Sequence, residues 1–217
     1  MDKNILNQQN QVWENSFSSK PEMFGLNPSI AAEKALKIFK EKKLKNILEL
    51  GAGLGRDSIF FAENFLNIKA LDYSQVGLDI INKKAKSKNL SDQIVTTVHD
   101  VRKKLPFEDN SLDGCYSHML YCMALTRDDL QKLNDEIQRI LKPGGINIYT
   151  VRHTNDGDFE RGIHRGEDLY ENDGIIVHYF SEKKVNSLLN GFKNISIEKF
   201  EEGAFPRKLF LVINEKK

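Results

Sequence analysis

The sequence predicts an α/β protein built around a doubly wound parallel sheet, and three observations support this class. Short apolar runs alternate with longer amphipathic segments from about residue 46 to the end, as strands and helices do in such folds. The first apolar run leads into Gly51, Gly53 and Gly55, which is typical of a buried strand that turns sharply into a helix. Asp72 follows about twenty residues later, where a second parallel strand would end.

Length and composition favour one ordinary soluble domain. The chain has 217 residues, 40% of them hydrophobic and 29% charged, with a mean hydropathy of −0.49. The net charge of +1 gives no global argument for a nucleic-acid or membrane partner, and no apolar run approaches the roughly 20 residues that span a bilayer. The polar residues 1–11 are unlike a secretory signal. Cys115 and Cys122 lack disulfide-framework or metal-site spacing, so we expect a reducing cytoplasm and no metal.

The core elements follow in order along residues 46–151. Apolar or β-branched runs predict five strands, at Asn46–Leu50, Ile68–Leu71, Ile94–Val98, Leu112–Ser117 and Ile146–Val151. Amphipathic spacing predicts helices at Arg56–Asn64, Gln75–Lys88 and Arg127–Leu141. Pro143-Gly144-Gly145 is expected to stop the last helix and form the turn before the fifth strand. Ligands of such sheets bind at the carboxyl ends of the strands.

Segments on both sides of this core predict further parts of the same domain. Val12–Phe17 and Ser29–Phe39 look like helices within residues 1–45. Residues 152–180 carry few apolar runs and many charges, and we interpret them as an insertion. In residues 181–217, Ser181 caps a helix that runs to Leu189. The strands Ile195–Phe200 and Leu209–Asn214 follow, and their short connection predicts antiparallel pairing.

Four motifs occur in order at fitting spacing. They are Glu49 followed by G-x-G-x-G at residues 51–55, then Asp72, then Asp100 after the third strand, and finally Leu141-Lys142-Pro143-Gly144-Gly145. Together they resemble the motifs of the class I S-adenosylmethionine-dependent methyltransferases, over about residues 28–151, and the closing strand pair matches that family's usual ending. The resemblance implies a Rossmann-like seven-stranded sheet of order 3-2-1-4-5-7-6 with strand 7 antiparallel, and S-adenosylmethionine as the cofactor.

The resemblance also implies a set of cofactor-binding residues, namely Glu49, Gly51, Ala52, Gly53, Gly55, Asp72, Tyr73, Asp100, Val101 and Ser117. The glycines let the backbone approach the ligand, and the following helix N-terminus faces the methionine carboxylate. Asp72 would accept from both ribose hydroxyls; its alternative role is an N-cap, which Ser74 could supply instead. Asp100 would read the adenine amino group with Val101, or be a turn residue.

Some roles stay open between two interpretations. Tyr73 is either a flat wall beside the cofactor or a packing residue, and Glu49 either touches the methionine ammonium or holds the glycine loop. A dinucleotide dehydrogenase is the closest competitor for the loop. Its G-x-G-x-x-G usually lies near the start of the domain, whereas here G-x-G-x-G is followed by Arg56-Asp57 and preceded by two candidate helices.

The fourth strand ends in the segment Cys115–Cys122, at the mouth where acceptors bind in this family. The segment lacks [Asp/Asn]-Pro-Pro-[Tyr/Phe] and a Pro-Cys pair, so DNA methylation is not expected. His118 and Tyr121 are the candidate catalytic residues. His118 is either a general base or a hydrogen-bonded wall residue, and Tyr121 is a similar lining group. Ser117 would border the cofactor's sulfur together with His118.

Arginines, histidines and tyrosines gather in and after the insertion, near the strand ends. The candidate acceptor contacts are Arg152, His153, Arg165, Tyr179 and Arg207, which would suit an anionic or polar small molecule. The alternative is that the arginines pair with neighbouring acids such as Asp158, Glu160 and Glu167. In the N-terminal segment, the apolar residues Trp13, Phe17, Met23 and Phe24 resemble the helical lid of small-molecule members, or pack over the sheet edge.

The layout looks like the small-molecule and metalloid branch, including tellurite-resistance and thiopurine-type enzymes, although two cysteines are fewer than arsenic methylation would need. We expect an enzyme that transfers a methyl group to a small-molecule acceptor by in-line displacement, through proximity and orientation. The alternatives are a non-catalytic cofactor-binding or regulatory protein, and an RNA or protein methyltransferase with a broad basic face. The motifs indicate which methyl donor binds, but they indicate neither the acceptor nor the oligomeric state.

Overall fold

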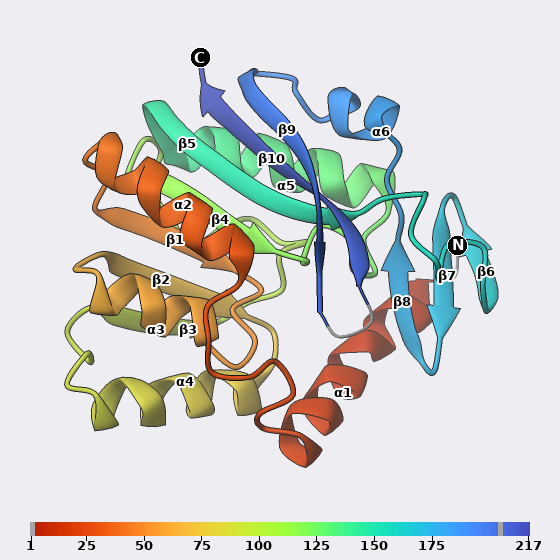
Figure 1. The fold of residues 1–217 in the computed structure, drawn as a ribbon, viewed down its shortest axis with the longest axis horizontal. Coiled ribbons are helices and arrows are strands. Elements are labelled where there is room, and N and C mark those ends of the chain that lie inside the picture. Colours follow the sequence, from red (N-terminus) through yellow and green to blue (C-terminus); the bar gives the residue numbers. More distant parts are fainter. Residues whose placement is uncertain (1–2, 204–205) are drawn as a thin grey trace.

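The computed structural model describes residues 3–203 and 206–217. Its large sheet contains β1 (Asn46–Leu50), β2 (Asn67–Asp72), β3 (Ile94–Val98), β4 (Leu112–His118), β5 (Leu141–Arg152), β9 (Phe192–Glu202) and β10 (Arg207–Lys216). The strand order is β3-β2-β1-β4-β5-β10-β9 (Figure 1). The first five strands are parallel, and β10 runs antiparallel to both β5 and β9. Because β9 and β10 are the sixth and seventh strands of this sheet, the predicted order 3-2-1-4-5-7-6 is confirmed.

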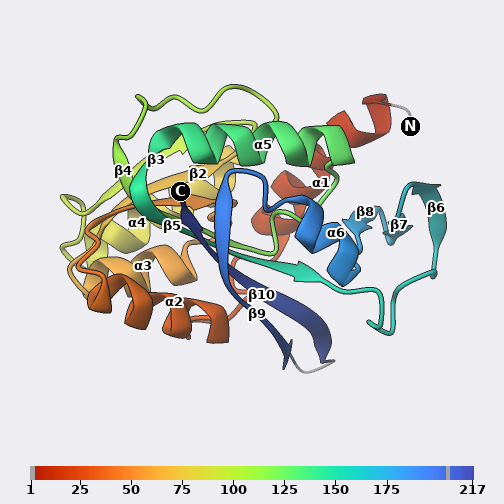
Figure 2. The ribbon, with the colours of Figure 1, turned by 90° about the horizontal axis from the view of Figure 1, so that it is seen from above.

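Helices cover both faces of the sheet (Figure 2). The helices of the described residues are α1 (Lys3–Ser19), α2 (Ile30–Glu41), α3 (Arg56–Glu63), α4 (Gln75–Ser87), α5 (Arg127–Ile140) and α6 (Glu182–Ser187). The apolar faces of α2, α3 and α4 share one buried cluster with Ile47, Ile68 and Ile148 of the sheet. Residues of α5 and α6 share a second large cluster with Leu48 and Leu50, and Leu6 of α1 belongs to a third, smaller one. Alternate side chains of β1 therefore point to opposite cores.

Local sequence signals explain where most helices begin. Ser29, Ser74 and Ser181 each accept a hydrogen bond from the first turn of the helix they precede, and Thr126 forms a capping box with Asp129. Ser181 therefore caps α6 as predicted. The helix α1 is longer than predicted, because its Asn- and Gln-rich first half has little apolar periodicity and gains its helicity from packing.

Two predicted boundaries are corrected by the structure. The Pro143-Gly144-Gly145 run does not stop α5, which ends at Ile140; the run lies inside β5, which begins at Leu141. The pairing between β4 and β5 shifts between Leu112 and Gly114, so the extra residues form an irregularity within the strand rather than a turn before it.

The insertion forms a small antiparallel sheet that the sequence analysis did not predict. It contains β6 (Ile163–Gly166), β7 (Leu169–Asn172) and β8 (Ile175–His178), in that order. The strands are only four residues long, β6 and β7 are largely exposed or partly buried and β8 is mostly buried, so none shows a clear alternating pattern. The Asp173-Gly174 pair, in which both residues have positive φ, was the available hairpin signal.

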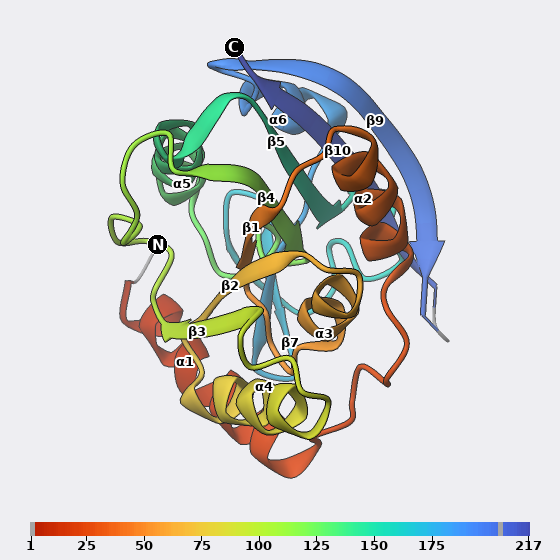
Figure 3. The same cartoon turned by 90° about the vertical axis from the view of Figure 1, so that its left-hand side faces the viewer.

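The helix α1 lies between the two sheets. It packs against α4 on one side (Figure 3) and against β8 on the other (Figure 1). Gln9 makes the second contact through two hydrogen bonds, one to Gly174 O and one from Ile176 N. The N-terminal helix and the insertion therefore stand together over the carboxyl ends of β1 to β4. No helix in the described residues is long and apolar enough to cross a membrane.

Candidate functional site

The glycine loop between β1 and α3 has the backbone geometry that only glycine tolerates well. Gly51, Gly53 and Gly55 have φ values of +69°, +53° and +77°. A Cβ on Gly55 would lie 2.5 Å from Cγ1 of Ile81, and one on Gly51 would lie 2.9 Å from Cβ of Leu120. Gly55 precedes α3 without a side-chain cap, which leaves the helix N-terminus directed at the loop. We call residues 51–55 the glycine cradle: at Gly51 and Gly55 neighbouring side chains leave no room for a Cβ, and at all three glycines the positive φ disfavours other residues.

Asp72 at the end of β2 is bound directly to this loop. One carboxylate oxygen accepts from Gly53 N at 2.8 Å, and the other accepts from Ser74 N at 2.9 Å. Ser74, rather than Asp72, caps α4 with its side chain, so the N-cap alternative for Asp72 does not apply. Burial raises the pKa of Asp72, although these backbone hydrogen bonds lower it in part. Each oxygen keeps a second lone pair for a ligand hydroxyl.

A cleft of about 350 Å³ opens beside Tyr73, the residue after Asp72, while Asp72 and the glycine loop do not line it themselves. It is lined by α1 and by the segments that follow β2, β3 and β4, and Tyr73, Asp100 and Val101 all contribute to its wall. His99 also lines the cleft. Its Nε2 atom is buried and has no hydrogen-bond partner within the described residues. Three of the predicted cofactor residues therefore meet at one cleft, and His99 joins them as a residue that the sequence analysis missed.

Asp100 carries a partner that the sequence analysis did not identify. Arg102 donates from Nη2 to one carboxylate oxygen at 2.7 Å and from Nε to the other at 3.0 Å. Burial alone would raise the pKa of Asp100, but the hydrogen bonds from Arg102 hold it below its usual value. Nη1 of Arg102 also donates to Asn7 of α1 at 2.9 Å. The floor of the cleft is thereby connected to the helix that covers it.

The N-terminal helix closes over the loop through polar and aromatic contacts. Asn10 donates to Tyr73 O at 2.8 Å, and Glu14 accepts from Gln75 N at 2.8 Å and from the Ser74 hydroxyl at 2.9 Å. Phe17 is buried against the glycine loop. The predicted helix in this region is confirmed, and its aromatic residue lies over the loop, but the polar anchors Asn10 and Glu14 were missed. Their only sequence signal is their spacing on one helix face.

Glu49 is held beneath the loop rather than exposed in the cleft. Its carboxylate accepts from the Ser58 hydroxyl of α3 at 2.5 Å, and burial together with the nearby Asp57 raises its pKa. Asp57 accepts in turn from the Tyr116 hydroxyl at 2.9 Å and from Ser29 N at 2.8 Å. This buried network joins β1, β4, α2 and α3, so it supports the interpretation in which Glu49 holds the loop.

At the end of β4, Ser117 and His118 point in different directions. Ser117 is fully buried, and its hydroxyl has no partner among the described residues. His118 is the last residue of β4 and has a side chain 15% exposed. Its Nδ1 is 3.0 Å from the Thr150 hydroxyl, and its Nε2 is 3.1 Å from a carboxylate oxygen of Glu202. Thr150 and Glu202 were not singled out by the sequence, because they lie far from His118 along the chain.

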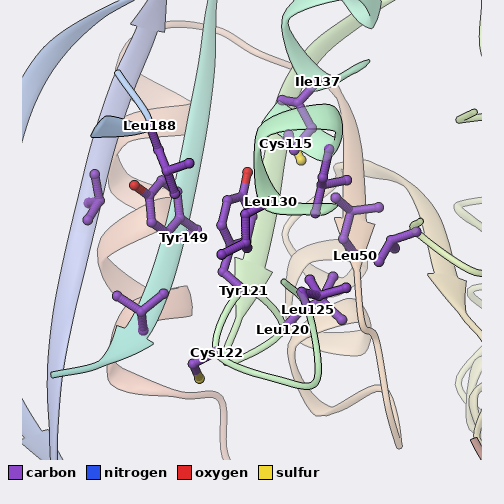
Figure 4. Close-up of a cluster of buried hydrophobic side chains, with 14 of the residues drawn as sticks. Leu50, Cys115, Leu120, Tyr121, Cys122, Leu125, Leu130, Ile137, Tyr149 and Leu188 are labelled. Atoms are coloured by element: carbon purple, nitrogen blue, oxygen red, sulfur yellow. The ribbon is translucent and has the colours of Figure 1, made fainter. Parts of the chain in front are cut away.

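Tyr121 does not reach the mouth. Its ring is fully buried and stacks on Tyr149, with ring centroids 4.2 Å apart (Figure 4). Asn147 donates to its hydroxyl at 3.3 Å. Burial raises the pKa of this hydroxyl well above its usual value. The structure therefore places Tyr121 in the core beneath the segment that follows β4.

The acceptor candidates do not converge on one point. The Arg152 guanidinium is buried, pairs with Asp156 and with Asp158 at 2.7 Å, and lies over the buried ring of Tyr179. Arg165 pairs with Glu171 at 2.6 Å. For both arginines the acid-pairing alternative matches what is observed.

The two remaining candidates differ in exposure. His153 is buried and its Nδ1 accepts from Asn155 N at 2.9 Å. Arg207 is exposed at the start of β10. Arg207 is therefore the candidate side chain most accessible from solvent.

Comparisons with known proteins agree with this geometry. Residues 47–145 match the family described as a methyltransferase domain. The chain is 29% identical over 174 residues to 24-methylenesterol C-methyltransferase 3 of Arabidopsis thaliana. The alignment covers 72% of this chain and 46% of that protein. It spans less than half the length of each curated relative that it matches.

Solved structures share the fold at low identity. The Burkholderia thailandensis 1,6-didemethyltoxoflavin-N1-methyltransferase, with 1,6-didemethyltoxoflavin and S-adenosylhomocysteine bound, superposes with a TM-score of 0.77 at 15% identity, covering 100% of this chain and 91% of that one. The [4+2]-cyclase SpnF superposes with a TM-score of 0.73 at 16% identity, covering 96% and 95%. Residues 47–145 therefore belong to the methyltransferase domain family, in a chain with the fold of the class I S-adenosylmethionine-dependent methyltransferases.

Proposed function

We propose that this chain is an enzyme that binds S-adenosylmethionine and transfers its methyl group to a small-molecule acceptor. The observation that carries the proposal is the glycine cradle bound to Asp72, whose neighbour in the chain, Tyr73, lines the cleft together with Asp100. The unpartnered buried polar atoms His99 Nε2 and Ser117 Oγ fit a polar ligand along the same edge.

Different residues of the site would contact the ribose, the adenine and the methionine part of the cofactor. Asp72 would accept from the ribose hydroxyls, and Asp100 and Val101 would meet the adenine edge beside Tyr73. The N-terminus of α3 would face the methionine carboxylate across the glycine loop. Glu49 would stabilise the loop from below through Ser58.

The cofactor supplies an electrophilic methyl group, so the chain need not supply a covalent nucleophile. The contribution of the protein is to hold the acceptor in line and to keep water out. We propose that residues 1–45 act as the lid and residues 152–180 as the acceptor-side insertion of a single domain, because α1 lines the cleft and Gln9 joins it to β8. His118 borders the acceptor at the mouth, and Tyr121 shapes that wall from beneath.

A small polar acceptor fits the residues at this edge. Arg207 is exposed at the start of the final strand and can meet an anionic or polar group. The net charge of +1 does not favour RNA. We also propose a cytoplasmic location, because both cysteines are free and buried.

Calorimetry with S-adenosylmethionine and S-adenosylhomocysteine on the full chain tests the donor site. We expect both to bind, and Asp72→Asn to weaken binding by about tenfold or more, because a neutral amide replaces an ionised acceptor. Asp79→Asn on the exposed face of α4 is the matched control and should leave the affinity unchanged. If the wild-type protein binds neither nucleoside, the proposal is wrong.

Transfer itself needs a separate measurement, since a [4+2]-cyclase shares this fold. Incubation with methyl-labelled S-adenosylmethionine and a panel of small polar metabolites should label at least one product. Binding without any transfer across the panel would instead support the cofactor-binding or regulatory alternative.

A further inference from the structure

Three side chains from separate strands are linked by hydrogen bonds at the end of β4, on the proposed acceptor side of the site. Thr150 of β5, His118 of β4 and Glu202 of β9 follow one another at 3.0 and 3.1 Å. Thr150 is fully buried, and Glu202 keeps 19% of its side chain exposed. These linked side chains therefore extend from the interior of the sheet to its surface.

The hydrogen bonds determine which nitrogen of His118 carries the proton. Nε2 of His118 lies 3.1 Å from a Glu202 carboxylate oxygen, and an ionised carboxylate only accepts, so Nε2 carries the proton and donates it. In the neutral ring Nδ1 is then an acceptor. The Thr150 hydroxyl, whose oxygen accepts from Met119 N at 2.9 Å, is the donor within reach of Nδ1.

Glu202 is itself held by two other elements. Its other carboxylate oxygen accepts from Ile30 N, at the start of α2, at 3.1 Å, and lies 3.9 Å from Nη2 of Arg56, at the start of α3. Burial would raise the pKa of Glu202, but the contact with His118 and the Ile30 hydrogen bond hold it below its usual value. Glu202 is therefore an ionised acceptor attached to both neighbouring helices.

The backbone at this point is also constrained. Met119 has a φ of +67°, a conformation that costs a non-glycine residue about 1 kcal/mol or more. Its N–H is the group bound to Thr150. Thr150 therefore stabilises both the strained turn after β4 and the ring of the residue before it.

We propose that Glu202 and Thr150 are positioning residues that hold the His118 ring in its Nε2–H form at the acceptor side of the site. This proposal rests on the proposed function only in that the acceptor is taken to bind beside His118 at the end of β4. Both ring nitrogens are bound to protein groups, so the His118 ring forms a wall that contacts the acceptor by shape and excludes water, and it abstracts no proton. The acceptor is accordingly of the class whose attacking atom already has a free lone pair, such as an uncharged amine or a thiolate formed in solution.

Histidine nitrogen NMR on the full chain tests the tautomer without any acceptor. The chain has five histidines, and His118→Asn assigns the signal. We expect the Nε2–H form in the wild type. Thr150→Val and Glu202→Gln should each change the tautomer ratio, by about tenfold for the loss of one hydrogen-bond constraint. Thr150→Ser retains the hydroxyl and should restore the wild-type signal. Glu201→Gln, an exposed neighbour on the same strand, is the control.

An Nδ1–H form in the wild type, or a tautomer ratio unchanged in both Thr150→Val and Glu202→Gln, would overturn the proposal. A purely structural role would lower stability without moving the ratio. Should Thr150→Val fail to fold, Glu202→Gln still decides, because its amide oxygen can accept from Ile30 N.

Two further measurements separate this inference from the proposed function. S-adenosylhomocysteine affinity should stay within about twofold in Glu202→Gln, because Glu202 does not line the donor cleft. With any acceptor found in the panel, His118→Asn should raise KM and leave the shape of the pH profile of kcat unchanged; loss of one limb of that profile would show that His118 is a base. Failure of the wild-type protein to bind the nucleoside would refute the proposed function and leave the tautomer result intact.

Discussion

Stability in mild acid should depend on one buried histidine, His178 at the end of β8. Its side chain is fully buried, with Nδ1 at 2.7 Å from Leu125 O and Nε2 at 2.7 Å from Nζ of Lys184. A carbonyl only accepts and an ammonium only donates, so the ring is neutral with its proton on Nδ1. A second proton on Nε2 would face the Lys184 ammonium directly.

The surrounding charges mostly oppose that second proton. Burial, then the charge of Lys184, lowers the pKa of His178 to about 4, with a smaller contribution from Arg127. Asp168, which pairs with Lys184, acts in the opposite sense. Glu167 also carries a carboxylate oxygen 3.6 Å from Nε2 and would attract the protonated ring.

The sign of the effect follows from the two states. The folded pKa lies below the ordinary value of 6.5, so between about pH 6.5 and pH 4 the unfolded chain binds more protons. The stabilisation is present above pH 6.5 and is lost as the pH falls through this window. A shift of this size corresponds to about 3 kcal/mol, which is a large share of a typical stability of about 5–15 kcal/mol.

Urea unfolding followed by circular dichroism at pH 7 and pH 4.5 measures this loss. His178→Asn keeps a donor near Leu125 O and cannot titrate, so its stability should fall less between the two pH values than that of the wild type, by about 2–3 kcal/mol. His164→Asn, at an exposed histidine of the same small sheet, should behave as the wild type. Equal pH dependence in His178→Asn and the wild type would refute the reasoning.

Three further predictions concern the glycine cradle, a strained surface residue and the adenine end of the cleft. Gly55→Ala should destabilise the protein by about 2 kcal/mol or more, because the strain of a positive φ adds to a clash with Ile81. Gly144→Ala also introduces a side chain at a positive φ but into open space, so it should cost about 1 kcal/mol. Equal losses of stability in thermal melts of the two variants would show that the clash at Gly55 does not matter. Phe65→Gly should raise the unfolding free energy by about 0.5–1 kcal/mol, since Phe65 has a φ of +65° and is 79% exposed; a lower melting temperature would count against it. Asp100→Asn should weaken S-adenosylhomocysteine binding by about tenfold in calorimetry, and an unchanged affinity would remove Asp100 from the adenine site.

Several parts of the fold could be predicted because their causes are local. The strands, the serine caps and the glycine loop each depend on residues within one or two turns of chain, so the strands of the large sheet and most helix starts agree with expectation. The order of the strands agrees too, but it was implied by the family resemblance. The missed elements had weak local signals. The strands β6 to β8 are short and show no alternating burial, and the polar first half of α1 depends on packing against α4 and β8.

The candidate site divides in the same way. Sequence spacing identified Asp72 and Asp100 because parallel strands bring their carboxyl ends to one edge. It could not identify the partner of a charged group. Arg102 on Asp100 and Glu202 on His118 are side-chain contacts set by geometry, and pairing of Arg152 with Asp156 rather than with an acceptor is decided by burial.

By itself, the sequence determined the parallel α/β class, the glycine cradle and the edge at which a nucleoside-bearing ligand would lie. These follow from hydrophobic period, backbone conformation and chain direction, which are properties of neighbouring residues. The strand order was implied by the family resemblance of the motifs. Only the tertiary structure decided which candidate side chains are already bound to other protein groups. Tyr121 and Arg152 are buried in the interior, and His118 lies between Thr150 and Glu202. The reason is physical: a hydrogen bond requires two atoms within about 3 Å, and only the folded chain brings residues from distant strands that close.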